Sequence, residues 1–403
     1  MSAFLGNLKS APLAAAANAM YKAWKVERNA ALMSRHYAGI AQKQGLVAPS
    51  GVRLEEALRT RLADRPRRLQ WPKAMGGLHV FLVYPHHNWE AVLPATLAPF
   101  GEISQFEWRS LGFDEGAPDW VQRRDLMNQQ LLRAFHAANK VRPIDIVVGY
   151  VSGYTVAPEV LLDMAAHGAV ITNFCFDDKI YWPGELRGGR YASTASIANA
   201  VDLNLTSDPG AATRYFAHGG LSMFHPEAAD PTWYKPMSMA FEYDVSFVGA
   251  AYGWRPKLVE GLRRRGIEVA CFGKGWPNGA IGNEDMNGLY ARSRINLGCG
   301  GIGYSHKLLC LKGRDFEVPM SGAVYLTQDN PELSLVFDVG EEMLTYRNID
   351  DCARVIRATL NDPQSAARIR QAARARCLKD HTYTARWTAV FRSLGAVARA
   401  SSD

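Results

Sequence analysis

Continuous apolar segments of strand length alternate with amphipathic helical segments from residue 78 onward, and this alternation constrains the fold more than any other feature. Residues 78–85 (LHVFLVYP) and 141–150 (VRPIDIVVGY) are apolar runs that end in turn residues. Residues 119–140 between them have the pattern of a long helix. Strands that are apolar on both faces are typical of a parallel sheet covered by helices. The sequence therefore predicts an α/β, doubly wound domain over residues 76–222.

A second α/β unit is predicted over residues 245–385, where strands and helices alternate again. A loop-rich passage with several prolines, 223–244, separates the two units and is interpreted as an interdomain linker. The helix within 386–403 could cross back to the first domain. A chain of 403 residues is long enough for two hydrophobic cores. We therefore expect two Rossmann-like domains.

Residues 1–75 are predicted to form an α-helical extension, because their first half is rich in alanine. No secretory signal and no apolar stretch long enough to span a membrane is evident in the sequence. Two interpretations stay open: the helices pack on their own domain or on a partner chain, or they lie on an anionic membrane surface. The second interpretation depends on the excess of basic residues up to residue 45, where Glu27 is the single acid. The basic residues are Lys9, Lys22, Lys25, Arg28, Arg35 and Lys43.

The net charge and the cysteine spacing indicate which kind of ligand and which redox compartment to expect. The 46 basic residues exceed the 39 acidic ones, giving a formal net charge of +7, and the excess is spread along the chain. Such a balance suits a diphosphate ligand or an anionic surface and does not predict nucleic-acid binding. The six cysteines lie far apart, without a Cys-x-x-Cys pair. Reduced thiols in a cytoplasmic protein are therefore expected.

Three glycine-rich loops follow consecutive predicted strands of the second unit: FVGAAYGWRPK (247–257), FGKGW (272–276) and GCGGIGYSHK (298–307). Backbone N–H groups, a helix dipole and a guanidinium at such loops would cradle a pyrophosphate. The first of these loops, FVGAAYGWRPK, is not a G-x-G-x-x-G motif. Plain turns and packing are therefore the competing interpretation. The candidate donor-binding residues in these loops are Gly249, Gly253, Arg255, Gly273, Gly275, Trp276, Gly301 and Lys307.

Glu317 is the most informative single acid of the second unit. It opens a short helix among apolar residues, with Arg314 three positions earlier and an apolar strand, 323–326, after it. A doubly wound domain presents an acid at the carboxyl edge of its sheet in this way. Arg314 and Glu317 could instead pair only with each other on one helical turn. We favour a donor-binding role for both.

The segment RDFEVPMSGAVYLT (314–327) resembles the donor-binding segment of GT-B glycosyltransferases, and most closely the CgeB-like, spore-maturation-type branch (glycosyltransferase family 1/4-like). The passage 221–236 resembles the hinge of the same enzymes. The resemblance implies GT-B architecture, with two Rossmann-like domains facing a cleft, and implies that Glu317 contacts the ribose of a nucleotide sugar. Retaining members with an E-x7-E pattern carry an acid where this chain has Leu309. The stereochemical outcome therefore stays open.

The resemblance also implies that the first domain supplies the catalytic base. His86 and His87 follow one predicted strand, and Asp177 and Asp178 follow another. Each could instead be a loop residue satisfied by backbone amides. The adjacent aspartates lack the D-x-D spacing of a metal motif, and GT-B enzymes generally need no metal. We expect no metal and no cofactor other than a UDP-, GDP- or dTDP-sugar as co-substrate.

The sequence thus predicts a metal-independent glycosyltransferase that transfers a sugar from a nucleoside diphosphate to an unidentified glycan, protein or small molecule. Two alternatives stay open. A nucleotide-sugar 2-epimerase shares the fold but would need several acids around the sugar. A non-catalytic sugar- or nucleotide-binding protein would fit the missing acid at position 309.

Overall fold

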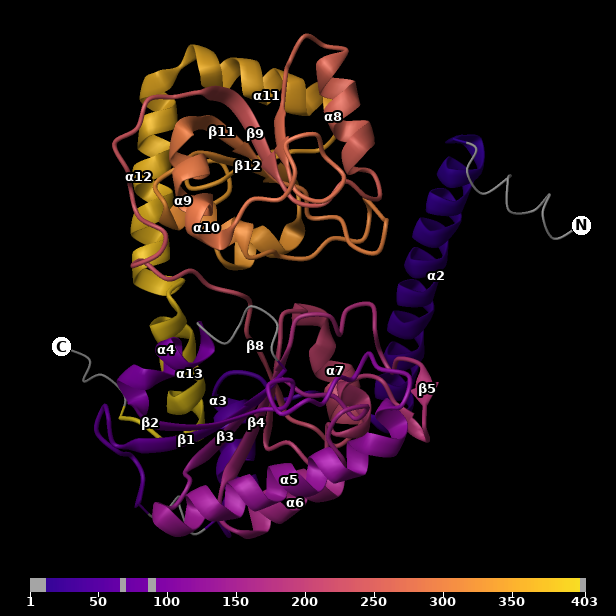
Figure 1. The fold of residues 1–403 in the computed structure, drawn as a ribbon, viewed down its shortest axis with the longest axis vertical. Coiled ribbons are helices and arrows are strands. Elements are labelled where there is room, and N and C mark those ends of the chain that lie inside the picture. The colour runs from indigo at the N-terminus through magenta and orange to yellow at the C-terminus, as the bar shows by residue number, and fades with distance from the viewer. Residues whose placement is uncertain (1–11, 66–69, 86–91, 399–403) are drawn as a thin grey trace, which may run out of the picture. The chain divides into compact units, whose positions relative to one another are not determined.

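The computed structural model describes residues 12–65, 70–85 and 92–398 (Figure 1). The chain divides into two compact units. Unit 1 consists of the residues up to Leu32 together with Glu227–Tyr383, and unit 2 consists of Met33–Pro226 together with the residues from Thr384 onward. The predicted histidines His86 and His87 lie outside the described residues.

Unit 2 is built on a six-stranded sheet with the order β2-β1-β3-β4-β7-β8, in which every neighbouring pair is parallel. All residues of its strand β1 are buried, as the apolar run predicts. The final strand, β8, was not predicted, because it lies where the apolar pattern gives way to the linker. The strands are β1 Leu78–Tyr84, β2 Gly101–Glu107, β3 Ile146–Gly149, β4 Val170–Cys175, β7 Leu203–Thr206 and β8 Ser222–Phe224.

Helices cover this sheet, and α5 and α6 run side by side along it (Figure 1). Met127 and Phe135 of α5 and Met164 of α6 are fully buried against Phe81 and Ile171 of the sheet. A small antiparallel hairpin, β5 Leu186–Arg187 with β6 Arg190–Tyr191, was not predicted, because strands of two residues leave no periodicity. The helices are α3 Val52–Arg61, α4 Leu93–Leu97, α5 Trp120–Val141, α6 Pro158–Ala166, α7 Ala212–Ala217 and α13 Tyr383–Leu394, with 3₁₀ turns at Ala98–Phe100, Thr194–Ser196 and Pro209–Ala211.

The last helix, α13, packs on unit 2 through two aromatic side chains. The indole N–H of Trp387 donates to the hydroxyl of Thr96 at 3.2 Å, and the Trp387 ring lies edge-on to Phe174. Phe391 packs against Phe100, with ring centroids 4.9 Å apart. The carboxyl-terminal helix therefore belongs to the core of unit 2.

Unit 1 is built on a five-stranded, fully parallel sheet with the order β10-β9-β11-β12-β13. Phe247, Ile295 and Leu326 from its central strands form a core with Leu258 and Ile356 from the helices. The strands are β9 Tyr243–Val248, β10 Ala270–Phe272, β11 Ser293–Leu297, β12 Tyr325–Gln328 and β13 Leu344–Tyr346. The helices are α8 Arg255–Arg263, α9 Asn283–Arg292, α10 Arg314–Met320, α11 Ile349–Asn361 and α12 Pro363–Asp380, with a 3₁₀ turn at Pro331–Leu335.

The amino-terminal extension contains one continuous helix, α2 (Pro12–Gln44), followed by α3. In unit 2, the Tyr37 hydroxyl accepts a hydrogen bond from the Trp182 indole N–H at 2.9 Å and lies 2.8 Å from Nε2 of His218. In unit 1, the carboxylate of Glu27 accepts a hydrogen bond from the hydroxyl of Ser305. The helix therefore packs on its own chain. None of the described helices combines the length and apolar character needed to cross a membrane.

Candidate functional site

The three glycine-rich loops lie together at the carboxyl edge of the unit 1 sheet. The loop after β9 pairs with the loop after β10, because the N–H of Gly249 donates to the carbonyl of Phe272 and the N–H of Ala251 donates to the carbonyl of Lys274, both at 2.8 Å. A Cβ atom on Gly253 would lie 3.2 Å from the Cα of Tyr304 in the loop after β11. The structure therefore brings together the loops that the sequence singled out.

Glycine is required where the first two loops cross. Gly273 has a φ of 133°, and a Cβ there would lie 2.5 Å from the carbonyl oxygen of Gly249. A side chain would strain the backbone and push the loops apart. Gly275 makes a similar approach to Ala251, and Gly301 to the carbonyl of Ser305. These close contacts explain why glycine occupies the three positions, whether or not a ligand binds there.

Arg255 and Trp276 hold the loop after β9 from two sides. The buried guanidinium of Arg255 donates to the carbonyl of Ala250 at 3.1 Å and stacks over the ring of Tyr252. The indole N–H of Trp276 donates to the carbonyl of Gly249 at 2.7 Å. Both side chains thus have loop-supporting partners, and their contact with a donor stays a prediction.

Lys307 differs from these two residues because its side chain is exposed. Its backbone N–H donates to the hydroxyl of Ser305 at 2.9 Å, which fixes the turn that carries it. The ammonium group is therefore available to an anionic ligand at the carboxyl edge.

Glu317 lies in a group of polar residues around the start of α10. Its Oε2 accepts a hydrogen bond from the Tyr290 hydroxyl at 3.1 Å, and the phenol of Tyr234 also bonds to its carboxylate. A second carboxylate, that of Glu227, approaches from the passage before β9. A Cβ atom on Gly313 would lie 2.7 Å from Oε2 of Glu227 and 2.9 Å from Oε1 of Glu317. We call Glu227, Tyr234, Tyr290, Arg314 and Glu317 the α10 polar cluster.

Arg314 is the cation of this cluster. Its Nε is shielded from solvent and has no hydrogen-bond acceptor among the described residues. No ion pair joins it to Glu317 within the described part of the chain, although its charge lowers the pKa of that carboxyl. A buried guanidinium N–H is normally satisfied. An oxyanion is the kind of group that would satisfy it.

Burial and mutual repulsion set the protonation of the two carboxyl groups. Burial is the main cause that raises the pKa of Glu227 to about 7, and the negative charge of Glu317 adds to it. Burial also raises the pKa of Glu317, against the charge of Arg314 and the two phenol hydrogen bonds. Glu227 is therefore the carboxyl group of the pair that holds a proton near neutral pH.

The two predicted aspartates of unit 2 have different surroundings. Asp178 is buried, and its Oδ2 accepts a hydrogen bond from the Tyr215 hydroxyl at 2.9 Å. Burial raises the pKa of Asp178 to about 6. Asp177 has an exposed side chain just after β4. Of the two, Asp177 is the one that a substrate could reach from solvent.

Three residues of the α10 polar cluster were not predicted from the sequence: Glu227, Tyr234 and Tyr290. Their distances from Glu317 along the chain, 27 residues or more, hide the proximity. The one available signal was the acid that follows a proline in the passage before β9, at positions 226 and 227.

Comparisons with known proteins identify a glycosyltransferase-like region. Residues 255–392 match the family described as glycosyl transferase-like. Sucrose-phosphate synthase from Thermosynechococcus elongatus shares the fold with a TM-score of 0.56, over 79% of this chain and 99% of its own, at 11% identity. The Anabaena protein HepE in complex with UDP and glucose has a TM-score of 0.53, over 80% of this chain and 99% of its own, at 10% identity. No curated protein has significant sequence similarity to this chain.

Together these matches define the fold class of the protein. The two parallel-sheet units and the solved neighbours show GT-B architecture, as the sequence predicted. The carboxyl-terminal third of the chain carries a glycosyl transferase-like domain, which contains Tyr290, Arg314 and Glu317 of the α10 polar cluster.

Proposed function

We propose that this protein is a glycosyltransferase that transfers a sugar from a nucleoside-diphosphate sugar to an acceptor. The observation that carries the proposal is the α10 polar cluster at the carboxyl edge of a glycosyl transferase-like domain. In it, a hydrogen-bonded carboxylate lies beside a guanidinium whose shielded Nε has no acceptor among the described residues. A nucleotide offers both complementary groups: ribose hydroxyls that donate to a carboxylate, and phosphate oxygens that accept from arginine.

The donor would be held at the start of α10 and at the glycine-rich loops. Glu317 accepts hydrogen bonds from the ribose, while Arg314 and Lys307 attract the diphosphate. Positive charge at the diphosphate stabilises the leaving group as the bond to the sugar breaks. HepE has been solved with UDP and glucose, which makes a UDP-sugar the first donor to test, followed by GDP- and dTDP-sugars.

Unit 2 would supply the acceptor side of the reaction. The exposed Asp177 and the predicted His86 and His87 are the proposed bases, and the buried Asp178 would position the turn after β4. We propose that transfer proceeds without a metal, since Arg314 and Lys307 provide cations for the leaving group. Membership of the CgeB-like branch is part of this proposal and is based on the sequence of residues 314–327.

Product analysis tests the proposal and separates it from its alternatives. The purified protein is incubated with each sugar nucleotide and candidate acceptors, with and without EDTA, and the products are identified by mass spectrometry. Free nucleoside diphosphate with a glycoside, undiminished by EDTA, is the expected result. An epimerised donor would identify a 2-epimerase instead. Binding without consumption would identify a non-catalytic binding protein.

We also propose a cytoplasmic protein whose helix α2 touches an anionic membrane surface. All six cysteines are free thiols, which supports a reducing compartment. Met20, Tyr21 and Trp24 are 68%, 58% and 54% exposed on α2, beside Lys22 and Lys25. Aromatic and basic residues of this kind bind lipid headgroups. Co-sedimentation with vesicles containing phosphatidylglycerol, but not with pure phosphatidylcholine, is expected. Equal co-sedimentation with the two kinds of vesicle, together with dimers detected by light scattering, would indicate that the helix contacts a partner chain instead.

A further inference from the structure

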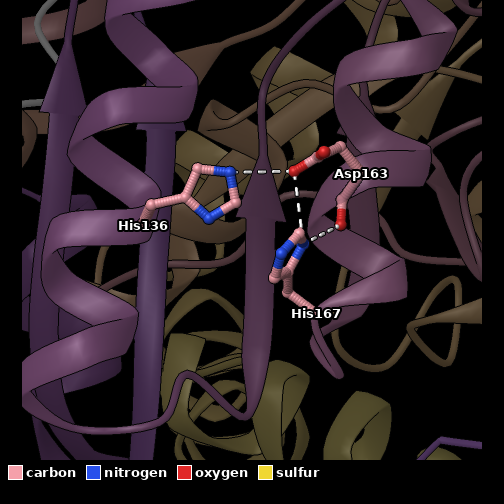
Figure 2. Close-up of side chains that lie close together, drawn as sticks. All are labelled: His136, Asp163 and His167. Atoms are coloured by element: carbon pink, nitrogen blue, oxygen red, sulfur yellow. Dashed lines mark hydrogen bonds and ion pairs between the residues drawn. The ribbon is translucent and has the colours of Figure 1, made fainter.

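Two histidines and an aspartate from α5 and α6 meet on the helical layer of unit 2. His136 comes from α5, Asp163 comes from α6, and His167 follows the end of α6 (Figure 2). Asp163 and His167 are four residues apart, so they lie on the same face of one helical turn. Figure 2 shows the imidazole of His136 pointing across to the Asp163 carboxylate, which is also adjacent to His167. No residue predicted for the transfer reaction belongs to this group.

The spacing of the three side chains is that of metal ligands. One donor atom from each residue lies within 4.8 Å of the other two. Nε2 of His136 is 3.0 Å from Oδ1 of Asp163. Two ligands of a tetrahedral ion, each bound at about 2.0 to 2.1 Å, lie about 3.3 Å apart. Nδ1 of His167 is 3.3 Å from the same oxygen, and the imidazole has 49% of its side-chain surface exposed.

The contacts of the Asp163 carboxylate also favour a metal site. Oδ1 of Asp163 is shielded from solvent and lies between the two imidazoles, 3.0 Å from Nε2 of His136 and 3.3 Å from Nδ1 of His167. A carboxylate oxygen between two imidazole nitrogens offers a divalent ion its three ligand atoms in one place. Nδ1 of His167 lies 2.8 Å from the carbonyl oxygen of Asp163, so it can donate its hydrogen there. A metal ion bound at Nδ1 would take the place of that hydrogen.

We propose that His136, Asp163 and His167 form a binding site for a divalent transition-metal ion such as Zn²⁺. Imidazole nitrogens suit zinc, copper and nickel better than magnesium or calcium, and the carboxylate contributes charge. Three protein ligands leave a fourth position for water on the exposed side. The ion would join α5 to α6.

The position of the site in the fold indicates a structural ion. In a doubly wound unit the helices run antiparallel to the strands, so the end of α6 lies at the amino edge of the sheet. Ligands of such folds bind at the carboxyl edge instead. The metal would therefore stabilise unit 2 and take no part in the transfer reaction.

Titration calorimetry of the full-length, metal-free protein with Zn²⁺ tests the proposal. One ion per chain is expected to bind to the wild type, and saturating Zn²⁺ should raise its melting temperature by mass action. His136→Ala and Asp163→Asn are each expected to weaken binding at least tenfold. Co²⁺ in place of Zn²⁺ should give a visible absorption band that both substitutions remove.

His36→Ala is the matched control, because His36 is an exposed histidine outside the group and its loss should leave Zn²⁺ affinity unchanged. Circular dichroism of the metal-free variants confirms that each still folds. Absence of Zn²⁺ binding by the wild type would overturn the proposal. Binding of one ion with equal affinity in the wild type and both ligand variants would overturn it as well.

Discussion

At the scale of single residues, Glu227 and Glu317 are the most informative pair, because both carboxyl groups lie against Gly313 beside the cation Arg314. Two half-buried carboxyl groups that lie close together are costly when both are charged, unless a proton or a ligand separates them. A ligand that brings hydroxyl donors to Glu317 and an anion to Arg314 would lower that cost. The charges of the cluster therefore favour binding over a purely structural role.

Glu317→Gln tests the assignment of the ribose contact. The amide keeps the size of the side chain but removes the charge that accepts from ribose hydroxyls. Hydrogen bonds to charged groups contribute about 1.5 to 3 kcal/mol. We expect nucleotide-sugar affinity, measured by calorimetry, to fall about 10- to 100-fold while the melting temperature stays the same or rises. Wild-type affinity in this variant would remove Glu317 from the site.

The raised pKa of Glu227 predicts a pH-dependent stability. The pKa is about 7 in the folded protein, against about 4.3 for an ordinary glutamate. The folded state thus binds the proton more tightly than the unfolded state does. The resulting stabilisation of the folded state is present below pH 4 and disappears as the pH rises to 7. Because Glu227 is partly exposed, we expect a loss on the order of 1 to 3 kcal/mol.

Glu227→Gln isolates this contribution from other groups, including Asp178 and Asp315, whose pKa values burial also raises. Melting temperatures of variant and wild type are compared between pH 4.5 and 8. The melting temperature of the variant should rise relative to that of the wild type as the pH increases. A constant difference across this range would show that Glu227 does not titrate there.

Residue-level contacts were the least predictable part of the site. Glu317 was singled out from its apolar neighbours and the short helix after the glycine-rich loops. Arg255 and Trp276 were chosen as ligand contacts, but their loop-supporting hydrogen bonds depend on how two loops cross, which no local pattern encodes. The proximity of Glu227 depends on a path through unit 1 that the irregular passage before β9 does not reveal.

At the scale of elements, the loop that leads into α10 carries the clearest test. Gly313→Ala would place a Cβ within 3.0 Å of an oxygen of Glu227 and one of Glu317, so both carboxyl groups must move. We expect nucleotide affinity to fall at least tenfold with the fold retained. Calorimetry and circular dichroism measure the two effects separately.

Gly288→Ala is the matched control within α9. Nothing lies within 4 Å of a Cβ at this position. Alanine in a helix interior is more favourable than glycine by about 0.5 to 1 kcal/mol. This variant should melt slightly higher and bind nucleotide like the wild type. Equal binding by the two glycine variants would show that the space beside Gly313 does not matter for the donor.

Long, strongly apolar elements were predictable, and short ones were not. The buried strands β1, β3 and β9 follow from their hydrophobic runs, and α5 follows from its 3.6-residue period. The hairpin β5–β6 and the strand β8 have two or three residues, which is too few for a periodic signal. The metal-ligand group was missed because His136 lies 27 residues before Asp163.

At the scale of the whole molecule, two parallel-sheet units with GT-B architecture were predictable, because each has its own alternation of strands and helices. We expect the side chains that select the nucleobase, the sugar and the acceptor to lie on loops, whose sequences follow no periodic pattern. The glycosyl transferase-like match covers residues 255–392, in the unit to which we assign donor binding. The acceptor must be found by experiment.

The proposed nucleotide-sugar site is tested by a thermal-shift screen of the full-length protein against UDP, GDP, dTDP and CMP and their sugar conjugates. A ligand that binds the folded state raises the melting temperature. We expect a clear rise with one nucleoside-diphosphate family, and a much smaller rise in Glu317→Gln at the same ligand concentration. No rise with any of these nucleotides would contradict a nucleotide-sugar donor site on this protein.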